Sequence, residues 1–332
     1  MGRVFVSRKV PGQAVPMLRE AGHSVEVWAG ELPPPPATLA ARVQEADALL
    51  ALLTDRIDAA MLERSPRLRV IANMAVGYDN VDPEVAAKAG VWVTNTPGVL
   101  AETTADFAFA LLLDVARRVT ESAVSARAGG WRTWSPGGFL GADVHGATLG
   151  IVGPGEIGLA VARRGLGFGM RVLCSGRPGA PRKGEWSGIE HVGLAGLLAA
   201  SDFVSLHVPL TEATRRMIGA KELSLMKRTA FLVNTSRGSV VDQDALVTAL
   251  VDGEIAGAAL DVTDPEPLPD GHPLYGMANV VITPHIASAS VATRSRMAEM
   301  AAQNIIAALA GEAPPNAVNR PDRPRALRPD GQ

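Results

Sequence analysis

The sequence predicts an α/β fold with parallel sheets, divided into two domains. Strand-like runs alternate with helical patterns along nearly the whole chain, and many runs are continuous Val, Ile and Leu. Such runs are typical of parallel strands that helices cover on both faces. The length, 332 residues, exceeds the size at which a single core stops growing. A glycine-rich turn at 153–158 lies mid-chain, so a complete α/β unit precedes it, over residues 1 to about 99.

Strands are expected wherever a short apolar run is bounded by turn residues. In chain order they are Val4–Val6, Ser24–Val27, Ala48–Leu53, Val70–Asn73, Val91–Thr94, Leu149–Val152, Arg171–Cys174, Phe203–Leu206, Ala230–Asn234, Gly257–Leu260 and Val280–Thr283. Residues 101–126 are expected to form the longest helix, which is apolar on most faces and should be buried on several sides, between domains or subunits. Residues 129–141, rich in Gly and Trp, are expected to be an irregular arm.

The C-terminal region is expected to contain one helix and a tail. The helix covers Val291–Leu309 and is followed by Gly311. Residues 320–332 are rich in Arg and Pro, a composition typical of a disordered, solvated tail.

Composition excludes several classes of protein. Hydrophobic residues make up 47% of the chain and charged residues 20%, which is typical of a globular protein. The net charge of −2 gives no electrostatic reason to expect nucleic acid or an anionic membrane as partner. The single cysteine, Cys174, fits a reducing compartment, and no cluster of Cys and His has metal-ligand spacing. No signal-peptide pattern begins the chain. We therefore expect a soluble, cytoplasmic protein without a metal.

The glycine-rich turn predicts that a dinucleotide binds. An apolar run ends in Gly153, Gly155 and Gly158, with the spacing G-x-G-x-x-G, and a helix-like segment follows. Gly153 allows the tight turn, Gly155 lets the backbone approach a pyrophosphate, and Gly158 lets helix and strand pack closely. The helix N-terminus then directs unpaired N–H groups at the phosphates. Glycine-rich turns also end ordinary βα units, so the prediction depends on the flanking strand and helix.

Three ionisable residues follow expected strands downstream of this turn. Arg237, Glu266 and His285 each lie in a Gly- or Pro-marked turn. Ligands of such sheets bind at the carboxyl ends of the strands. A histidine can supply the proton that an alkoxide needs when a 2-keto acid is reduced, and a paired carboxylate holds its ring and favours its charged form. An arginine can bind the substrate carboxylate and polarise the carbonyl.

Simpler roles also fit these residues when each is taken alone. Arg237 fits a surface ion pair, Glu266 an ordinary turn, and His285 a loop histidine bonded to backbone. The remaining histidines are interpreted as structural: His23, His145, His191, His207 and His272. Of these, His207 ends a strand beside the expected cofactor cleft.

Several segments spread along the chain carry a family resemblance. They are Asn73–Asn80, Thr94–Leu100, Thr104–Leu113, the glycine-rich turn, Asn234–Asp242 and Thr283–Ser288. Together they resemble the D-isomer-specific 2-hydroxyacid dehydrogenases, and most closely the glyoxylate/hydroxypyruvate reductases, up to about Arg320. The resemblance implies two Rossmann-like domains, one flavodoxin-like and one dinucleotide-binding, with a cleft between them. The substrate-binding domain would contain residues 1–99 and 289–319, and the dinucleotide-binding domain residues 100–288.

The resemblance also implies a role for each candidate residue. Arg237 matches the substrate-binding arginine, Glu266 the acid that pairs with the histidine, and His285 the proton donor. The implied substrate contacts are Val76, Gly77, Arg237 and Ser288, the first two through backbone N–H groups. The implied cofactor contacts are Thr104, Gly153, Gly155, Glu156, Ile157, Gly158, Ser175, Gly176, Arg177, His207, Val208, Pro209, Thr214, Thr235, Ser236, Asp261, His285 and Ala287.

The resemblance further implies a homodimer in which the helix and arm of residues 101–150 make the contact. The chain departs from the family pattern at two positions. Glu156 stands where many relatives have Arg, and a carboxylate beside a pyrophosphate is repulsive unless it points to solvent. Ala287 stands where relatives often have Gly.

The segment after the second strand of the dinucleotide domain predicts a preference for NADP(H) over NAD(H). Enzymes that prefer NAD place an acid about 20 residues after the fingerprint, where it binds the ribose hydroxyls. Here Gly176 stands near that position and Arg177 follows, with Arg182 and Lys183 soon after. A 2′-phosphate would gain from these charges and would meet no carboxylate. A basic surface loop without this role is the alternative.

The leading hypothesis is the reduction of glyoxylate or hydroxypyruvate to the 2-hydroxy acid. Phosphite dehydrogenase resembles the chain near residues 302–320, but that enzyme has a lysine where Val76 stands here. Oxidation of another D-2-hydroxyacid is a further alternative. A different class is a corepressor that senses NAD(H) and binds partner peptides; turnover of a small 2-keto acid distinguishes the enzyme from it.

Overall fold

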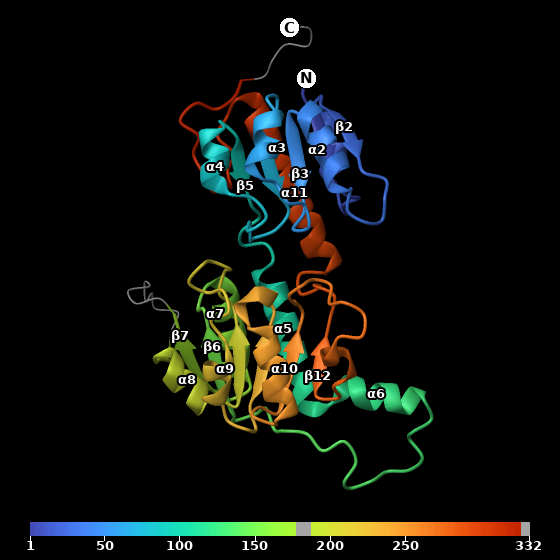
Figure 1. The fold of residues 1–332 in the computed structure, drawn as a ribbon, viewed down its shortest axis with the longest axis vertical. Helices are drawn as coiled ribbons and strands as arrows, with labels where there is room; N and C mark the ends of the chain where they lie inside the picture. Colours follow the sequence, from blue (N-terminus) through green and yellow to red (C-terminus); the bar gives the residue numbers. More distant parts are fainter. Residues whose placement is uncertain (177–186, 327–332) are drawn as a thin grey trace. The chain divides into compact units, whose positions relative to one another are not determined.

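The computed structural model describes residues 1–176 and 187–326, in two compact units (Figure 1). Unit 1 comprises Met1–Leu100 and Ala289–Gln332, and unit 2 comprises Ala101–Ser288. Each unit has its own parallel sheet and its own buried core. No helix in the described part of the chain is both long enough and apolar enough to cross a membrane.

Unit 1 is built on a five-stranded parallel sheet with the order β2-β1-β3-β4-β5. The strands are β1 (Arg3–Val6), β2 (Ser24–Val27), β3 (Ala48–Ala51), β4 (Val70–Asn73) and β5 (Trp92–Thr94). The helices are α1 (Ala14–Glu20), α2 (Pro36–Glu45), α3 (Ala59–Arg64), α4 (Pro83–Lys88) and α11 (Val291–Ala310). This strand order is that of the flavodoxin-like fold. α11 packs against α1, β3 and β4, so the end of the chain returns to this unit.

Local sequence explains where several of these helices begin and end. The side chains of Asp58 and Ser290 each accept a backbone N–H of the first turn, and so cap α3 and α11. Pro83 begins α4, at a position where its missing N–H leaves no hydrogen bond unmade. Gly311 ends α11 with a φ of 89°, a conformation that glycine adopts without strain.

Unit 2 is built on a seven-stranded parallel sheet with the order β12-β11-β10-β9-β6-β7-β8. The strands are β6 (Thr148–Val152), β7 (Arg171–Ser175), β8 (Ile189–His191), β9 (Phe203–Leu206), β10 (Phe231–Asn234), β11 (Gly257–Leu260) and β12 (Val280–Ile282). The helices are α5 (Ala101–Arg117), α6 (Val119–Arg127), α7 (Glu156–Gly167), α8 (Leu194–Ala200), α9 (Ala220–Ser224) and α10 (Gln243–Val251). The order reverses between β6 and β9, where open parallel sheets bind their ligands. The predicted fold class is confirmed.

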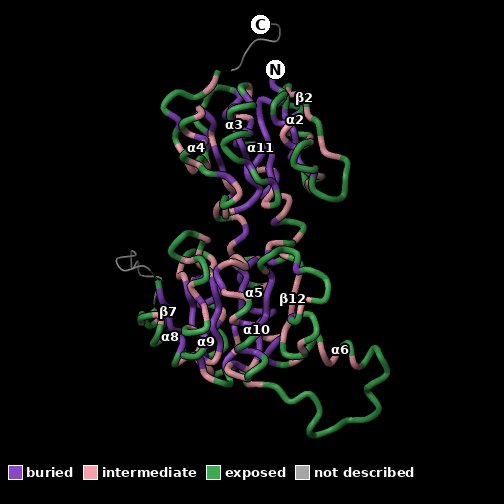
Figure 2. Tube along the Cα trace, viewed as in Figure 1, coloured by how far each residue is buried: buried purple, intermediate pink, exposed green. Residues whose placement is uncertain are grey.

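The continuous apolar runs of the sequence are the central strands of the two sheets. Every residue of β3, β4, β9 and β11 is buried, and Figure 2 shows most strands in the colour of buried residues. Helices cover both faces of such a strand, so neither set of alternating side chains can be polar. The carboxyl ends of β6, β9, β10, β11 and β12 are thereby fixed at one edge of unit 2.

The helix expected over residues 101–126 is interrupted. α5 ends at Arg117, Arg118 adopts a left-handed backbone (φ 54°, ψ 40°), and α6 begins at Val119. α5 buries one face, whereas α6 has no buried residue and the arm after it is exposed (Figure 2). Within one chain, residues 119–126 are not buried, so the expected burial there would require a second subunit. The hydrophobic pattern does not reveal the break, because arginine is an ordinary helix former.

One edge strand was not predicted. β8 pairs with β7 at the edge of the sheet of unit 2, and its sequence is Ile-Glu-His. A run with one apolar residue gives no strand signal, and its two polar residues are exposed.

The predicted disordered tail begins too early in the chain. Residues 320–326 pack against unit 1, where the Arg325 guanidinium donates to the carbonyl oxygens of Ser65 and Leu68. Arg69 in turn donates to the carbonyl oxygen of Arg325 at 2.7 Å. Specific hydrogen bonds to buried carbonyls order a segment whose composition alone is typical of disorder. Residues 327–332 lie outside the described part of the chain.

Candidate active site

The glycine-rich turn joins β6 to α7, and two of its three glycines lie in close contact with other backbone atoms. Gly153 has a φ of 92°, and a Cβ added to it would lie 2.8 Å from the carbonyl oxygen of His207. A Cβ on Gly158 would lie 2.3 Å from the carbonyl oxygen of Gly153. A Cβ on Gly155 would meet no heavy atom within 4 Å. Gly153 and Gly158 are therefore required by the fold itself, whereas Gly155 faces open space.

The N-terminus of α7 faces the same open side. The first backbone N–H to be bonded within the helix is that of Leu159, which donates to the carbonyl oxygen of Gly155 at 2.9 Å. Gly155 is the N-cap and has no side chain to satisfy the N–H groups that precede Leu159. Unpaired N–H groups and the positive end of the helix dipole favour an anion here. The open approach and the helix N-terminus together fit a dinucleotide pyrophosphate.

A pair of alanine substitutions distinguishes the two kinds of glycine. Gly158→Ala should lower the Tm by about 5 °C, because its Cβ forces the turn and the helix apart. Gly155→Ala should leave the Tm within about 1 °C of the wild-type value and should weaken dinucleotide binding about tenfold, because its Cβ would project only into the ligand space. Differential scanning fluorimetry and titration of cofactor fluorescence measure both effects. Equal losses of stability in the two variants would contradict this distinction.

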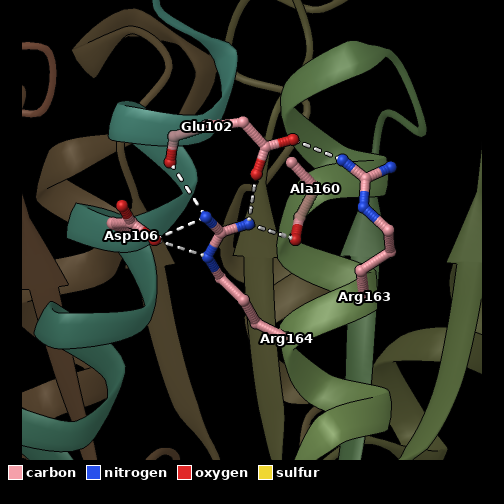
Figure 3. Close-up of polar contacts among 5 residues, drawn as sticks. All are labelled: Glu102, Asp106, Ala160, Arg163 and Arg164. Atoms are coloured by element: carbon pink, nitrogen blue, oxygen red, sulfur yellow. Dashed lines mark hydrogen bonds and ion pairs between the residues drawn. The ribbon is translucent and has the colours of Figure 1, made fainter.

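α7 is also tied to α5 by a cluster of charged side chains (Figure 3). Arg164 donates to Asp106 through Nε at 2.8 Å and pairs with Glu102 at 3.0 Å, and Arg163 also pairs with Glu102. The hydrogen bond from Arg164 holds the pKa of the Glu102 carboxyl below its usual value. Glu102 and Asp106 are exposed, so the contribution of these pairs to stability is small. They join the helix that begins at the glycine-rich turn to α5.

His285 and Glu266 form a hydrogen-bonded pair beyond the ends of β12 and β11. The distance between His285 Nδ1 and Glu266 Oε1 is 2.6 Å. His285 has a φ of 53°, an unfavourable conformation for histidine, and its backbone N–H donates to the carbonyl oxygens of Asp261 and Thr283. Because Nδ1 bonds the carboxylate, a proton transferred to a ligand would leave from Nε2. The pair can act as a general acid whose ring the carboxylate orients.

Asp261 holds the loop that carries His285. It is buried at the end of β11, and one carboxylate oxygen accepts the hydroxyl of Thr283 at 2.7 Å and the N–H of Ile286 at 2.8 Å. The other oxygen accepts the N–H of Ala287 at 2.8 Å. Burial raises the pKa of the Asp261 carboxyl, and these hydrogen bonds and the nearby His285 oppose that rise. The resemblance suggested a contact with the cofactor; the anchoring of this loop could not be read from the sequence.

Arg237 lies in a turn that Asn234 shapes. The Asn234 amide donates to the carbonyl oxygen of Arg237 at 2.9 Å and accepts the N–H and hydroxyl of Ser236 at 3.0 and 2.8 Å. Gly238 follows, and a Cβ there would lie 2.0 Å from the backbone of Thr263, after β11. The turn therefore packs closely against the segment that leads to Glu266. The half-buried guanidinium of Arg237 donates to the carbonyl oxygen of Ser236 at 2.8 Å.

In unit 1, two asparagine side chains donate hydrogen bonds to carbonyl oxygens of the loop after β4. Asn95 donates to the carbonyl oxygen of Val76 at 2.9 Å, and Asn73 donates to that of Gly77 at 2.7 Å. The backbone N–H groups of Val76 and Gly77 donate to no acceptor within the described part of the chain. Adjacent unpaired N–H groups form an anion-binding concavity. The motif segments contained both asparagines, but only the structure reveals that their amides orient this loop.

Most of the remaining predicted contacts lie near the ends of β7, β9 and β10 in unit 2. Burial lowers the pKa of His207 to about 3, so its ring is neutral, and its Nε2 lies 2.8 Å from the Ser205 hydroxyl. The Thr214 hydroxyl donates to the carbonyl oxygen of Pro209 at 2.6 Å. The Thr235 hydroxyl is buried without a hydrogen-bond partner in the described structure, so a ligand there would satisfy it. The other positions in this unit are Thr104, Ser175, Gly176, Val208, Ala287 and Ser288.

Arg177, Arg182 and Lys183 lie outside the described residues. Within residues 1–176 and 187–326, no three His, Cys, Asp or Glu side chains gather as they would around a metal ion.

Comparison with known proteins connects this site to one family. Residues 109–287 match the family model described as D-isomer specific 2-hydroxyacid dehydrogenase, NAD binding domain. A glyoxylate reductase of Korarchaeum cryptofilum is 55% identical over 319 residues, which are 96% of each chain. A glyoxylate reductase of Thermococcus litoralis is 50% identical over 322 residues, 96% of this chain and 97% of its own.

Two solved structures are similar over nearly their whole length. A protein of Thermus thermophilus has a TM-score of 0.90 and 52% identity, with 95% of this chain and 99% of that one covered. The NADPH-dependent glyoxylate/hydroxypyruvate reductase of Sinorhizobium meliloti, in complex with NADP and malonate, has a TM-score of 0.83 and 34% identity. The comparison covers 98% of this chain and 99% of that reductase.

Proposed function

The chain belongs to the D-isomer specific 2-hydroxyacid dehydrogenase family, and from this premise we propose that it reduces glyoxylate or hydroxypyruvate with NADPH. The observation that carries the proposal is the pair of His285 and Glu266, whose Nδ1 and Oε1 atoms are 2.6 Å apart, at the edge of the sheet where Arg237 follows β10. Relatives about half identical over the whole chain are glyoxylate reductases, which supports the substrate class. Unit 1 would bind the substrate and unit 2 the cofactor.

Each residue of the site has a separate task in this reaction. A nicotinamide cofactor, when bound, would supply the hydride that the carbonyl carbon of the 2-keto acid receives. His285 gives the proton from Nε2 to the developing alkoxide, and Glu266 holds the imidazole through Nδ1. Arg237 binds the substrate carboxylate and polarises the carbonyl. The N–H groups of Val76 and Gly77 in unit 1 would bind a substrate carboxylate, because asparagine amides already donate to the carbonyl oxygens of both residues.

The residues present fit a dinucleotide, and two observations favour NADPH over NADH. Gly176 follows β7, so this position contributes no side-chain carboxylate that would repel a 2′-phosphate. The similar reductase of Sinorhizobium meliloti is NADPH-dependent. Arg177 would add a positive charge beside the phosphate. Measurement of kcat/KM with both cofactors tests the preference, and a higher value with NADH would reject it.

A panel of small 2-keto acids tests the proposed activity. Glyoxylate and hydroxypyruvate should give the highest kcat/KM, with pyruvate and phosphorylated 2-keto acids as comparisons. Arg237 is the one strongly basic side chain proposed at the substrate, so a phosphate group on the 2-keto acid should not raise kcat/KM. Binding of NADPH without turnover of any 2-keto acid would instead favour a corepressor that senses the cofactor.

Glu156 gives a prediction about cofactor affinity. It is the first residue of α7, at the proposed pyrophosphate site, where its charge opposes that of the phosphates. Glu156→Gln should lower the Kd for NADPH about two- to fivefold at low salt, since a charge pair a few ångströms apart in water is worth about 1 kcal/mol. The gain should shrink in 0.5 M salt. Glu254→Gln, at the amino end of β11, is the matched control. An equal Kd for Glu156→Gln and the wild type would mean that this carboxylate points away from the phosphates.

A homodimer through α6 and the arm is also proposed. α6 has no buried residue, and Trp131 and Trp134 in the arm are 78% and 80% exposed. Large exposed aromatic side chains are typical of surfaces that a partner covers. Analytical ultracentrifugation should give twice the mass of the 34.6 kDa chain, and the Trp131→Ser, Trp134→Ser double variant should shift towards monomer.

A further inference from the structure

We propose that Pro154 is a specificity-determining residue, because its ring fills the space that a side chain at position 176 would need. The ring thereby keeps out the carboxylate with which a dinucleotide domain of this kind selects NAD(H). This inference rests on the proposed preference for NADP(H) and names a second residue that enforces it.

The evidence is the distance between the two positions. A Cβ built on Gly176 would lie 2.8 Å from Cδ and 2.9 Å from Cγ of Pro154, closer than Cβ atoms come to other atoms in proteins. Apart from the neighbours of Gly176 in the chain, no other heavy atom of residues 1–176 and 187–326 lies within 4 Å of that Cβ. The backbone of Gly176 is not in the left-handed region, so a side chain there would meet no strain of that kind. The proline ring is therefore the obstacle to a side chain at 176.

The ring has little freedom to move aside. The N–H of Gly155 donates to the carbonyl oxygen of Gly153 at 2.9 Å, which closes a three-residue turn across Pro154. The N–H of Gly153 donates to the carbonyl oxygen of Ser175 at 2.9 Å and fixes this turn to the end of β7. On its other side the turn packs against His207. Proline has a fixed φ, so the turn, the ring and Gly176 form one rigid arrangement.

The arrangement matters because position 176 follows the second strand of the dinucleotide sheet. An acid there binds the ribose hydroxyls of NAD(H) and repels the 2′-phosphate of NADP(H). Substitution of Gly176 by Asp alone would not create that acid in a usable position. It would displace the turn that binds the pyrophosphate, which both cofactors share. Pro154→Ala removes both Cγ and Cδ, the two atoms that obstruct the side chain.

The test is a double-mutant cycle of G176D and P154A, with kcat/KM and Kd measured for NADPH and for NADH, and with the Tm of each variant. In G176D, kcat/KM should fall about 100-fold with NADPH and should also fall with NADH, because the displaced turn weakens the binding of both cofactors. P154A should keep the preference for NADPH. The kcat/KM of the double variant with NADH should be about tenfold higher than that of G176D, and the double variant should prefer NADH. A coupling of this size, about 1.4 kcal/mol, is typical of residues in contact.

A second pair of variants, with a smaller side chain at position 176, keeps the test valid if G176D does not fold. G176A adds only the Cβ, so it should weaken both cofactors equally, and P154A should restore them in the P154A/G176A variant. If G176D alone prefers NADH as strongly as the double variant, or if G176A binds both cofactors as the wild type does, the proposal is wrong while the proposed function stands. A wild-type preference for NADH would reject the proposed cofactor, and the coupling between the two positions would still be read from NADH alone.

Discussion

Replacement of His285 by alanine is expected to lower kcat for glyoxylate by about 10²–10⁴-fold, the usual contribution of a positioned general acid. The loss should fall on kcat rather than on cofactor affinity, because the ring is bonded to Glu266 and not to the glycine-rich turn. Stopped-flow measurement of NADPH oxidation and fluorescence titration of NADPH binding separate the two quantities.

The loop itself should survive this substitution. Asp261 holds the loop through the hydroxyl of Thr283 and the backbone N–H groups of Ile286 and Ala287, none of which the substitution removes. Asp261→Asn is the contrasting variant, since an amide offers only one acceptor oxygen and should lower both the Tm and kcat. Loss of NADPH binding in His285→Ala, at an unchanged Tm, would contradict the role assigned to His285.

Replacement of Arg237 by alanine is expected to lower kcat/KM for glyoxylate by about 10³-fold or more, with a higher KM and a lower kcat. The guanidinium is proposed to bind the substrate carboxylate in both the ground state and the transition state. It should polarise the carbonyl most strongly in the transition state, where negative charge develops on the carbonyl oxygen. The turn that carries it should remain, because Asn234 bonds the carbonyl oxygen of residue 237 and not its side chain.

Arg237→Lys separates charge from geometry. Lysine keeps the positive charge and loses the planar fork, so it should recover only part of the lost kcat/KM. Lys227→Ala, which breaks an ion pair with Asp202 in the same unit, is the control for loss of a basic side chain. If Arg237→Ala changed kcat/KM no more than Lys227→Ala, Arg237 would be the surface ion-pair partner that its sequence alone also allows.

The sequence predicted the fold well wherever a single rule decides the structure. Parallel strands buried on both faces must be continuously apolar, and the G-x-G-x-x-G spacing needs a strand before it and a helix after it. Prediction from the sequence failed where a single residue or a single contact decides the local structure. Arg118 ends a helix that the apolar pattern continues, and Arg325 bonds residues 320–326 to unit 1 although their composition is typical of disorder.

The candidate site divides in the same way. The ends of the strands indicated His285, Glu266 and Arg237, because function concentrates there in parallel sheets. The residues that shape the surrounding loops were not predicted as such. Asp261 bonds the loop of His285, Asn73 and Asn95 bond backbone carbonyls of the loop after β4, and Pro154, after β6, lies against Gly176, after the neighbouring β7. Asp261, Asn95 and Pro154 act through contacts with segments 19 or more residues away, and Asn73 acts within its own loop; neither spacing nor composition reveals such contacts.

Transfer of deuterium from NADPH to glyoxylate tests the central claim most directly. The protein is incubated with glyoxylate and NADPH deuterated at C4 of the dihydronicotinamide, each C4 epimer separately, and the glycolate is analysed by mass spectrometry. One epimer should give glycolate with one deuterium at C2, whereas unlabelled NADPH in D₂O should give none at C2, because the solvent proton goes to oxygen. Folded protein that binds NADPH but gives no labelled glycolate from either epimer would contradict the account.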